Sequence, residues 1–172
     1  MVHSFPTRRS SDLDGRALGK PMIEGGYTAA AEFHIEAKYA NGVTMTTTNR
    51  APCGIRFEGT EGWVYVERGG TKYSHPELEE AKFDDSKDIR LYRSNHHMGN
   101  FIECVRDRKD PICTVEIGHR SISVAHLNVI SVRLGRKIKW DPVAETIIGD
   151  KEAEAMLSRP MRKPYDYSFI GL

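Results

Sequence analysis

The chain has 172 residues, with 25 basic and 24 acidic side chains and a formal net charge of +1. This balance gives no electrostatic signature of a nucleic-acid-binding or membrane-surface protein, and no apolar run approaches the 18 residues of a membrane span. Its three cysteines, Cys53, Cys104 and Cys113, lack CxxC spacing, so they predict free thiols and neither a disulfide framework nor a zinc knuckle.

The first thirteen residues, MVHSFPTRRSSDL, show no periodic pattern. A secretory signal would need an apolar run after Arg8 and Arg9, and none follows. Residues 3–13, HSFPTRRSSDL, resemble the translation of a short-read sequencing adapter over their whole length. We therefore expect residues 1–13 to be a non-native leader, with a single native domain over 14–172 whose preceding part has been lost. A natural disordered leader is the alternative.

The next segments predict β-structure. Residues 14–26 are glycine-rich and irregular, which predicts a connection. EFHIEAKY (32–39) alternates polar and apolar residues, as a strand with one buried face does. Asn41-Gly42 predicts a tight hairpin turn with positive φ at both residues, and VTMTTTN continues the alternation. This hairpin should carry a polar face built from Glu32, His34, Glu36, Lys38 and three threonines.

A second group of strands is predicted at 55–58, 63–65 and 71–73, with glycine-containing turns between them. Residues 74–90 are charged and predict a loop, with a possible strand at 89–92.

Apolar spacing then changes to the helical period. It predicts a helix over 96–108 that Asp110-Pro111 ends, and a longer helix over 115–134 between a Thr114 N-cap and a Gly135 C-cap. KIKW predicts a strand, Asp150 should cap a helix over 151–158, and the tail should lie extended on the surface. Strands followed by helices predict an α+β fold with an open-faced, mainly antiparallel sheet and helices packed on one face.

Residue patterns by themselves reveal little chemistry. GxGxxG and GxxxxGK[ST] are both absent, so no cofactor site is predicted in this chain. His119 and His126 lie seven residues apart on the long helix, about 10 Å along its axis, too far to share a metal ion. His119, beside Arg120 near the start of that helix, could contact a polar substrate, because a helix N-terminus favours anions. A capping or interdomain hydrogen bond is the alternative role for His119.

Four segments add a family resemblance: NFIECVRDRKDP, VEIGHRS, LGRKIKWDP and LSRPMRKP. Together they resemble the C-terminal end of Gfo/Idh/MocA-type oxidoreductases, above all bacterial members that act on sugars. FEGTEGWVYV in the predicted hairpins resembles the sheet of the same domain. The resemblance covers about residues 14–172. It implies a parent protein with an N-terminal Rossmann domain that binds NAD or NADP, followed by this α+β domain, which shapes the substrate pocket and the oligomer interface.

The same resemblance places the glycine-rich loop, the catalytic lysine and the acid–base pair before Asp14. No catalytic, cofactor-binding or metal-binding residue is therefore assigned to this chain, which should be inactive without the Rossmann domain. The candidates at the edge of a substrate pocket are His97, His119 and Arg120. Expected partners are the Rossmann domain and a second copy that meets the open sheet face, with no nucleic acid and no membrane. The compartment, cytoplasmic or periplasmic, stays open. The alternative function is a non-catalytic module that binds a sugar or a protein.

Overall fold

The computed structural model describes residues 11–17, 29–82, 84, 86 and 92–170. Contacts divide the chain into two compact units. One unit holds the described residues of 48–118, and the other holds those of 4–47 and 119–172. The prediction of an α+β fold with mainly antiparallel strands is confirmed, although the strands form two sheets, one of five strands and one of three.

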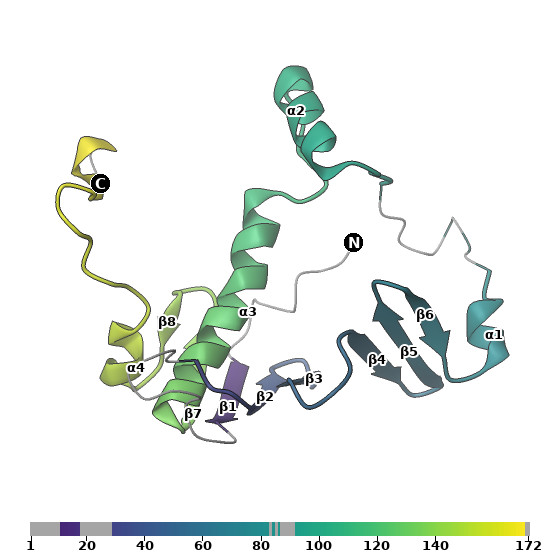
Figure 1. Ribbon diagram of the computed structural model, residues 1–172, viewed down its shortest axis with the longest axis horizontal. Helices are drawn as coiled ribbons and strands as arrows, with labels where there is room; N and C mark the ends of the chain where they lie inside the picture. Colours follow the sequence, from purple (N-terminus) through teal and green to yellow (C-terminus); the bar gives the residue numbers. More distant parts are fainter. Residues whose placement is uncertain (1–10, 18–28, 83, 85, 87–91, 171–172) are drawn as a thin grey trace. The chain divides into compact units, whose positions relative to one another are not determined.

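The five-stranded sheet has the order β3-β2-β1-β7-β8 (Figure 1). Its central strand β1 pairs antiparallel with both β2 and β7, and β7 pairs antiparallel with β8. The five strands are β1 (Ser11–Ala17), β2 (Phe33–Tyr39), β3 (Thr44–Thr48), β7 (Lys137–Asp141) and β8 (Thr146–Ile147).

Strand β1 corrects one sequence prediction, because its residues 14–17 fall within the segment for which the sequence predicts an irregular connection. Asp and Gly are poor strand formers, but hydrogen bonds to a neighbour on each side hold this strand whatever its side chains prefer. The boundary predicted between residues 13 and 14 lies inside β1, and Leu13 belongs to the core with 2% of its surface exposed.

The hairpin between β2 and β3 forms as predicted, but its turn differs. Gly42 N donates to Tyr39 O at 2.9 Å, which makes Ala40 and Asn41 the central residues of the turn. Gly42 alone has a positive φ, of 89°, while Asn41 accepts a hydrogen bond from Val43 N at its side-chain oxygen. The prediction of positive φ at both Asn41 and Gly42 is therefore wrong. The turn has the three-residue form in which a glycine follows a type I turn.

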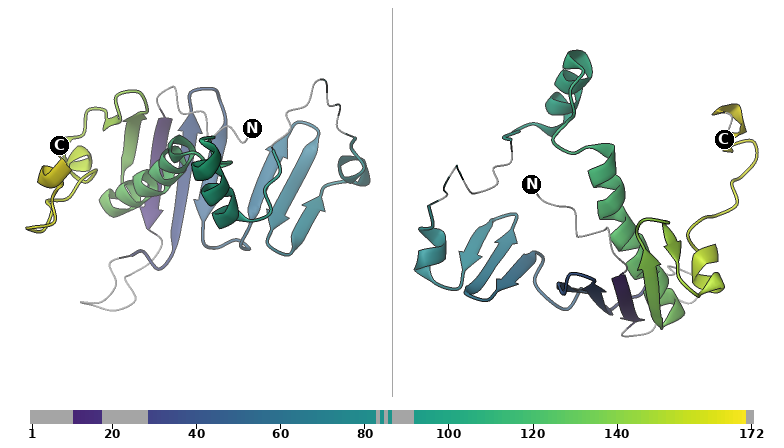
Figure 2. Two further views of the ribbon diagram at one scale, coloured as in Figure 1. Left: turned by 90° about the horizontal axis from the view of Figure 1, so that it is seen from above. Right: turned by 180° about the vertical axis from the view of Figure 1, so that it is seen from behind.

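Helix α3 (Val115–Leu134) packs on one face of this sheet (Figures 1 and 2). Helix α4 (Lys151–Ala155) adds Ala153 to the same core. The buried cluster consists of Leu13, Ala37, Tyr39, Leu127, Ile130, Ile138, Ile147 and Ala153. On β2 the predicted alternation is confirmed, since Ile35 and Tyr39 are buried whereas Glu36 and Lys38 are exposed.

The other unit contains a three-stranded antiparallel sheet in the order β4-β5-β6, which confirms the second group of predicted strands. Its elements are β4 (Ile55–Gly59), β5 (Gly62–Glu67), β6 (Gly70–Tyr73) and the one-turn helix α1 (Pro76–Glu79). Helix α1 stands where the sequence predicted only loop, because a proline is well suited to the first position of a helix. The strand predicted at 89–92 lies mostly outside the described residues.

The helix ends follow local signals, with one exception. Helix α2 (His97–Asp107) confirms the helix predicted over 96–108 to within one residue at each end. Arg108 ends it ahead of Asp110-Pro111, since Arg108 adopts a left-handed φ of 57° and its N–H bonds to Cys104 O. Thr114 Oγ1 accepts from Ile117 N at 3.3 Å, and Gly135 has a φ of 62°, so both predicted caps of α3 are confirmed. In the tail, a 3-10 helix (Tyr167–Ile170) replaces part of the predicted extended segment.

Candidate functional site

His119, on helix α3, meets Glu145 across 26 residues of sequence. Its Nε2 lies 2.9 Å from Glu145 Oε1, within hydrogen-bond distance. Each side chain is 49% exposed, so solvent or a ligand can reach the pair. The pair lies within the unit that holds the five-stranded sheet. Of the predicted site residues, His119 thus has a partner that gives its imidazole a defined orientation.

The turn between β7 and β8 holds Glu145 in place. The Asp141 carboxylate accepts hydrogen bonds from Ala144 N at 3.1 Å and from Val143 N at 2.8 Å. These two backbone bonds lower the pKa of the Asp141 carboxyl below its usual range. Glu145, which ends the turn, adopts a left-handed φ of 52°. This conformation is strained for a residue with a side chain, and such strain is concentrated at functional sites.

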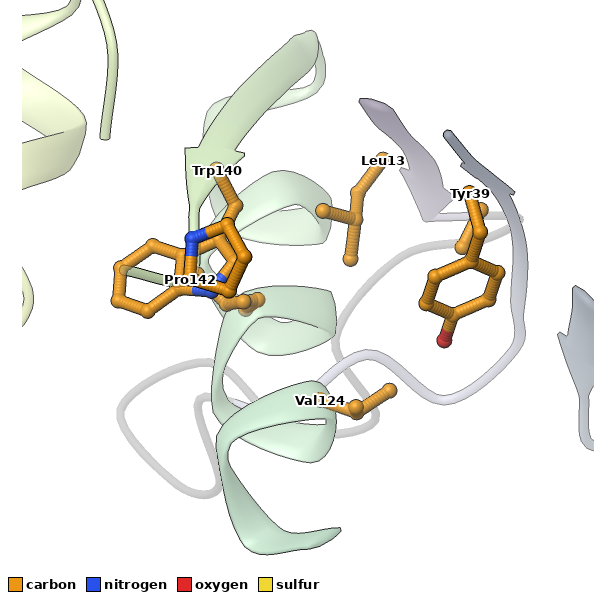
Figure 3. Close-up of a pocket in the computed structure, with 7 residues that line it drawn as sticks. Leu13, Tyr39, Val124, Trp140 and Pro142 are labelled. Carbon is orange, nitrogen blue, oxygen red and sulfur yellow. The ribbon is translucent and has the colours of Figure 1, made fainter. Parts of the chain in front are cut away.

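An apolar hollow lies between α3 and the sheet (Figure 3). The residues that line it are Leu13, Ala37, Tyr39, Val124, Leu127, Trp140 and Pro142. Its cavity volume of about 20 Å³ admits little more than one water molecule. A sugar therefore does not fit inside it, and the hollow is a loosely packed corner of the core.

The hollow and the His119–Glu145 pair share structural elements. Val124 comes from the same helix as His119, and Pro142 opens the turn that Glu145 ends. Tyr39 also lines the hollow, and burial raises the pKa of its hydroxyl to about 12. Its hydroxyl has a weak donor contact to Met45 Sδ at 3.7 Å.

The two other predicted site residues belong to different units. Arg120 follows His119 on α3 and is half-buried. His97 is the exposed first residue of α2 and belongs to the other unit. Its neighbour His96 is the N-cap of α2, since His96 Nδ1 accepts from Gly99 N at 2.8 Å. Sequence reasoning missed Glu145, because no local pattern marks a glutamate whose partner lies on a distant helix.

The sheet face opposite α3 carries charges that face each other across the strands. Asp12 stands opposite Lys38 on β2 and opposite Lys139 on β7, and its carboxylate lies 3.0 Å from Lys137 Nζ. Opposite charges on neighbouring strands stabilise a sheet modestly. The face is therefore polar, with charges of both signs close together.

The residues that the structure describes contain no group of three or more His, Cys, Asp or Glu side chains that could hold a metal ion. They also include no helix that is long and apolar enough to cross a membrane. Cys53, Cys104 and Cys113 are free thiols, as the sequence predicted.

A protein-family model described as "Oxidoreductase family, C-terminal alpha/beta domain" matches residues 27–167. No curated protein and no solved structure matches the chain. The matched residues make up well over half of the chain, and they include α3, β7 and the turn that carries Glu145. The chain therefore belongs to the Gfo/Idh/MocA oxidoreductase family, of which it contains the C-terminal α/β domain.

Proposed function

We propose that this domain forms the substrate side of an NAD(P)-dependent oxidoreductase that acts on a sugar-like or polyol hydroxyl. In this proposal a Rossmann domain binds NAD or NADP, and the present chain contributes pocket residues and a subunit interface. The observation that carries the proposal is the family match, which spans the His119–Glu145 pair. A half-exposed imidazole next to a carboxylate suits the recognition of hydroxyl groups, because the two side chains offer hydrogen-bonding atoms that solvent can reach.

The division of labour between the domains is tested by ligand titration of the 172-residue chain. We expect NADH and NADPH to show no saturable binding, since the sequence lacks a glycine-rich phosphate loop. Titration with a polyol such as inositol should perturb signals of His119 at millimolar concentrations. A His119→Ala variant should remove that response. Tight, saturable binding of NADH would contradict the proposal.

The parent architecture is tested in the coding DNA. Reading the coding frame upstream of the present chain should reveal a GxGxxG motif after a strand, then a Glu-Lys-Pro motif. A coding frame without these motifs would favour the second candidate function, a non-catalytic module that binds a sugar or a protein. The observation behind that candidate is the polar sheet face that carries Asp12, Lys38 and Lys139.

The proposed subunit interface uses this same polar face. Lys38→Glu would place a glutamate opposite Asp12 on the neighbouring strand, in the chain and in a second copy that meets this face. The repulsion between these carboxylates should weaken association. Arg133→Glu, at an exposed position of α3, is a matched charge reversal on the helix that packs on the opposite face of the sheet. Light scattering at several protein concentrations measures the result. A strict monomer at all concentrations would exclude the interface.

A further inference from the structure

We propose that Glu145 is a positioning residue: it holds the imidazole of His119 with the proton on Nε2, so that Nδ1 accepts a hydrogen bond from a substrate hydroxyl. The substrate half of this inference rests on the proposed function. The positioning half rests on the geometry of the pair alone and applies to the chain without any ligand.

The chemistry of the two side chains determines which nitrogen carries the proton. An ionised carboxylate only accepts hydrogen bonds. His119 Nε2 lies 2.9 Å from Glu145 Oε1, so Nε2 must be the donor. In a neutral imidazole the other nitrogen, Nδ1, then carries a lone pair. Within the described part of the chain, Glu145 is the side-chain partner of His119, and Nδ1 is left to meet solvent or a ligand.

The backbone at Glu145 indicates that the pair does more than stabilise the fold. An exposed ion pair contributes little to stability, and both partners are 49% exposed. Glu145 nevertheless sits in a left-handed conformation, with a φ of 52°, where glycine would be free of strain. The strained backbone is maintained by the Asp141 carboxylate, which binds Val143 N and Ala144 N. The turn thus holds the Glu145 carboxylate against His119 in a strained backbone conformation. The small stabilisation from the exposed pair does not offset the free energy of that strain.

A hydroxyl-bearing ligand fits the resulting acceptor. A hydroxyl group donates one hydrogen bond, and an unprotonated Nδ1 accepts one. An imidazole whose Nε2 faces a carboxylate is also held in a fixed ring orientation, which lowers the entropic cost of binding. Sugars and polyols are the small molecules richest in such donors.

The positioning half is tested by nitrogen-15 spectroscopy of the histidine rings near pH 8. In the wild-type chain we expect the shift of a protonated nitrogen at His119 Nε2 and that of an unprotonated nitrogen at Nδ1. Glu145→Gly removes the carboxylate and relieves the positive φ, so both nitrogen shifts should move toward the average of a tautomer mixture, while the urea midpoint of unfolding stays the same or rises. Glu145→Gln keeps an acceptor, and should move the two shifts less. Glu152→Gln, at a carboxylate that pairs with Arg136, is the matched control and should leave His119 unchanged.

The substrate half is tested by adding inositol to the same samples. Wild type should show a shift at His119 Nδ1, and Glu145→Gly should bind the polyol at least several-fold more weakly. If His119 has the same ring signals in wild type and Glu145→Gly, the positioning role is wrong even if the polyol binds. If the tautomer depends on Glu145 but no polyol perturbs Nδ1, the hydroxyl acceptor role fails together with the proposed substrate class, and the positioning role stands.

Discussion

The backbone nitrogen of Gly15, in the central strand β1, donates a hydrogen bond to the hydroxyl oxygen of Ser131 at 2.6 Å. This contact joins the five-stranded sheet to helix α3 across 116 residues. Ser131 is fully buried, and its hydroxyl also lies within hydrogen-bond distance of Leu13 O and Arg136 O. Gly15 and Ser131 therefore allow the helix to lie close to the strand, and the Ser131 hydroxyl supplies a hydrogen-bond partner for the backbone there.

Gly15→Ala should destabilise the chain by about 1–3 kcal/mol, as overpacking in a tight core does. The added Cβ would come within 2.8 Å of both Ser131 Oγ and Val132 N, and the second atom belongs to the helix backbone, which cannot simply rotate away. Urea unfolding measures the change. Gly118→Ala is the matched control: it lies in α3 with no atom within 4 Å of the new Cβ, and it should stabilise by about 0.5–1 kcal/mol. Equal midpoints for the two variants would contradict the close approach at Gly15.

Ser131→Ala should cost about 1–3 kcal/mol, because it leaves the buried Gly15 N–H without its side-chain acceptor. Ser123→Ala provides the comparison. The Ser123 hydroxyl donates to His119 O at 2.8 Å on the same helix but in an exposed setting, so its loss should be close to neutral. Thermal and urea unfolding of the two variants should therefore separate them clearly. A neutral Ser131→Ala would show that the strand does not depend on this hydroxyl.

Tyr39 should make stability depend on alkaline pH. Burial raises its pKa to about 12 in the folded chain, against about 10 in an unfolded one. The folded state therefore holds the phenolic proton more tightly. The contribution of protonated Tyr39 to the free energy of unfolding is fully present below pH 10 and is lost as the pH rises from about 10 to 12. Urea midpoints across this range should fall less steeply in Tyr39→Phe than in wild type. Tyr167→Phe, which removes a hydroxyl from a side chain that is 55% exposed, should behave as wild type does.

Asp150 should make stability depend on acidic pH. The Arg136 guanidinium, with distances of 2.9 and 3.0 Å to the carboxylate, is the main cause that lowers the pKa of Asp150, and the bond from Ala153 N adds to it. The contribution of ionised Asp150 to the free energy of unfolding is thus present above about pH 3.9, the pKa of an aspartate in the unfolded chain. It is lost as the pH falls through the lower pKa that Asp150 has in the folded chain.

Asp150→Asn separates the charge from the helix cap. Asparagine caps a helix about as well as aspartate, so α4 should persist at neutral pH. The fall in the urea midpoint between pH 4 and pH 2 should become shallower than in wild type. Unchanged acid dependence in Asp150→Asn would show that other carboxylates account for it.

Local signals in the sequence were sufficient for much of the fold. Alternation in EFHIEAKY predicted which face of β2 is buried, and Ile35 and Tyr39 are buried as expected. Thr114 and Gly135 mark the ends of α3, because a hydroxyl N-cap and a left-handed glycine satisfy helix ends through neighbouring residues only. Such signals act over a few residues and can be recognised without knowing the rest of the structure.

Sequence alone therefore determined the α+β class, most strands, the ends of α3 and the family resemblance, since each depends on patterns along the chain. Tertiary structure decided the rest. Strand β1 forms because two neighbouring strands supply its hydrogen bonds, although Asp14 and Gly15 disfavour a strand. The pairing of His119 with Glu145 likewise depends on how the β7–β8 turn meets a helix 26 residues away, and no local pattern encodes a contact between groups that only folding brings together.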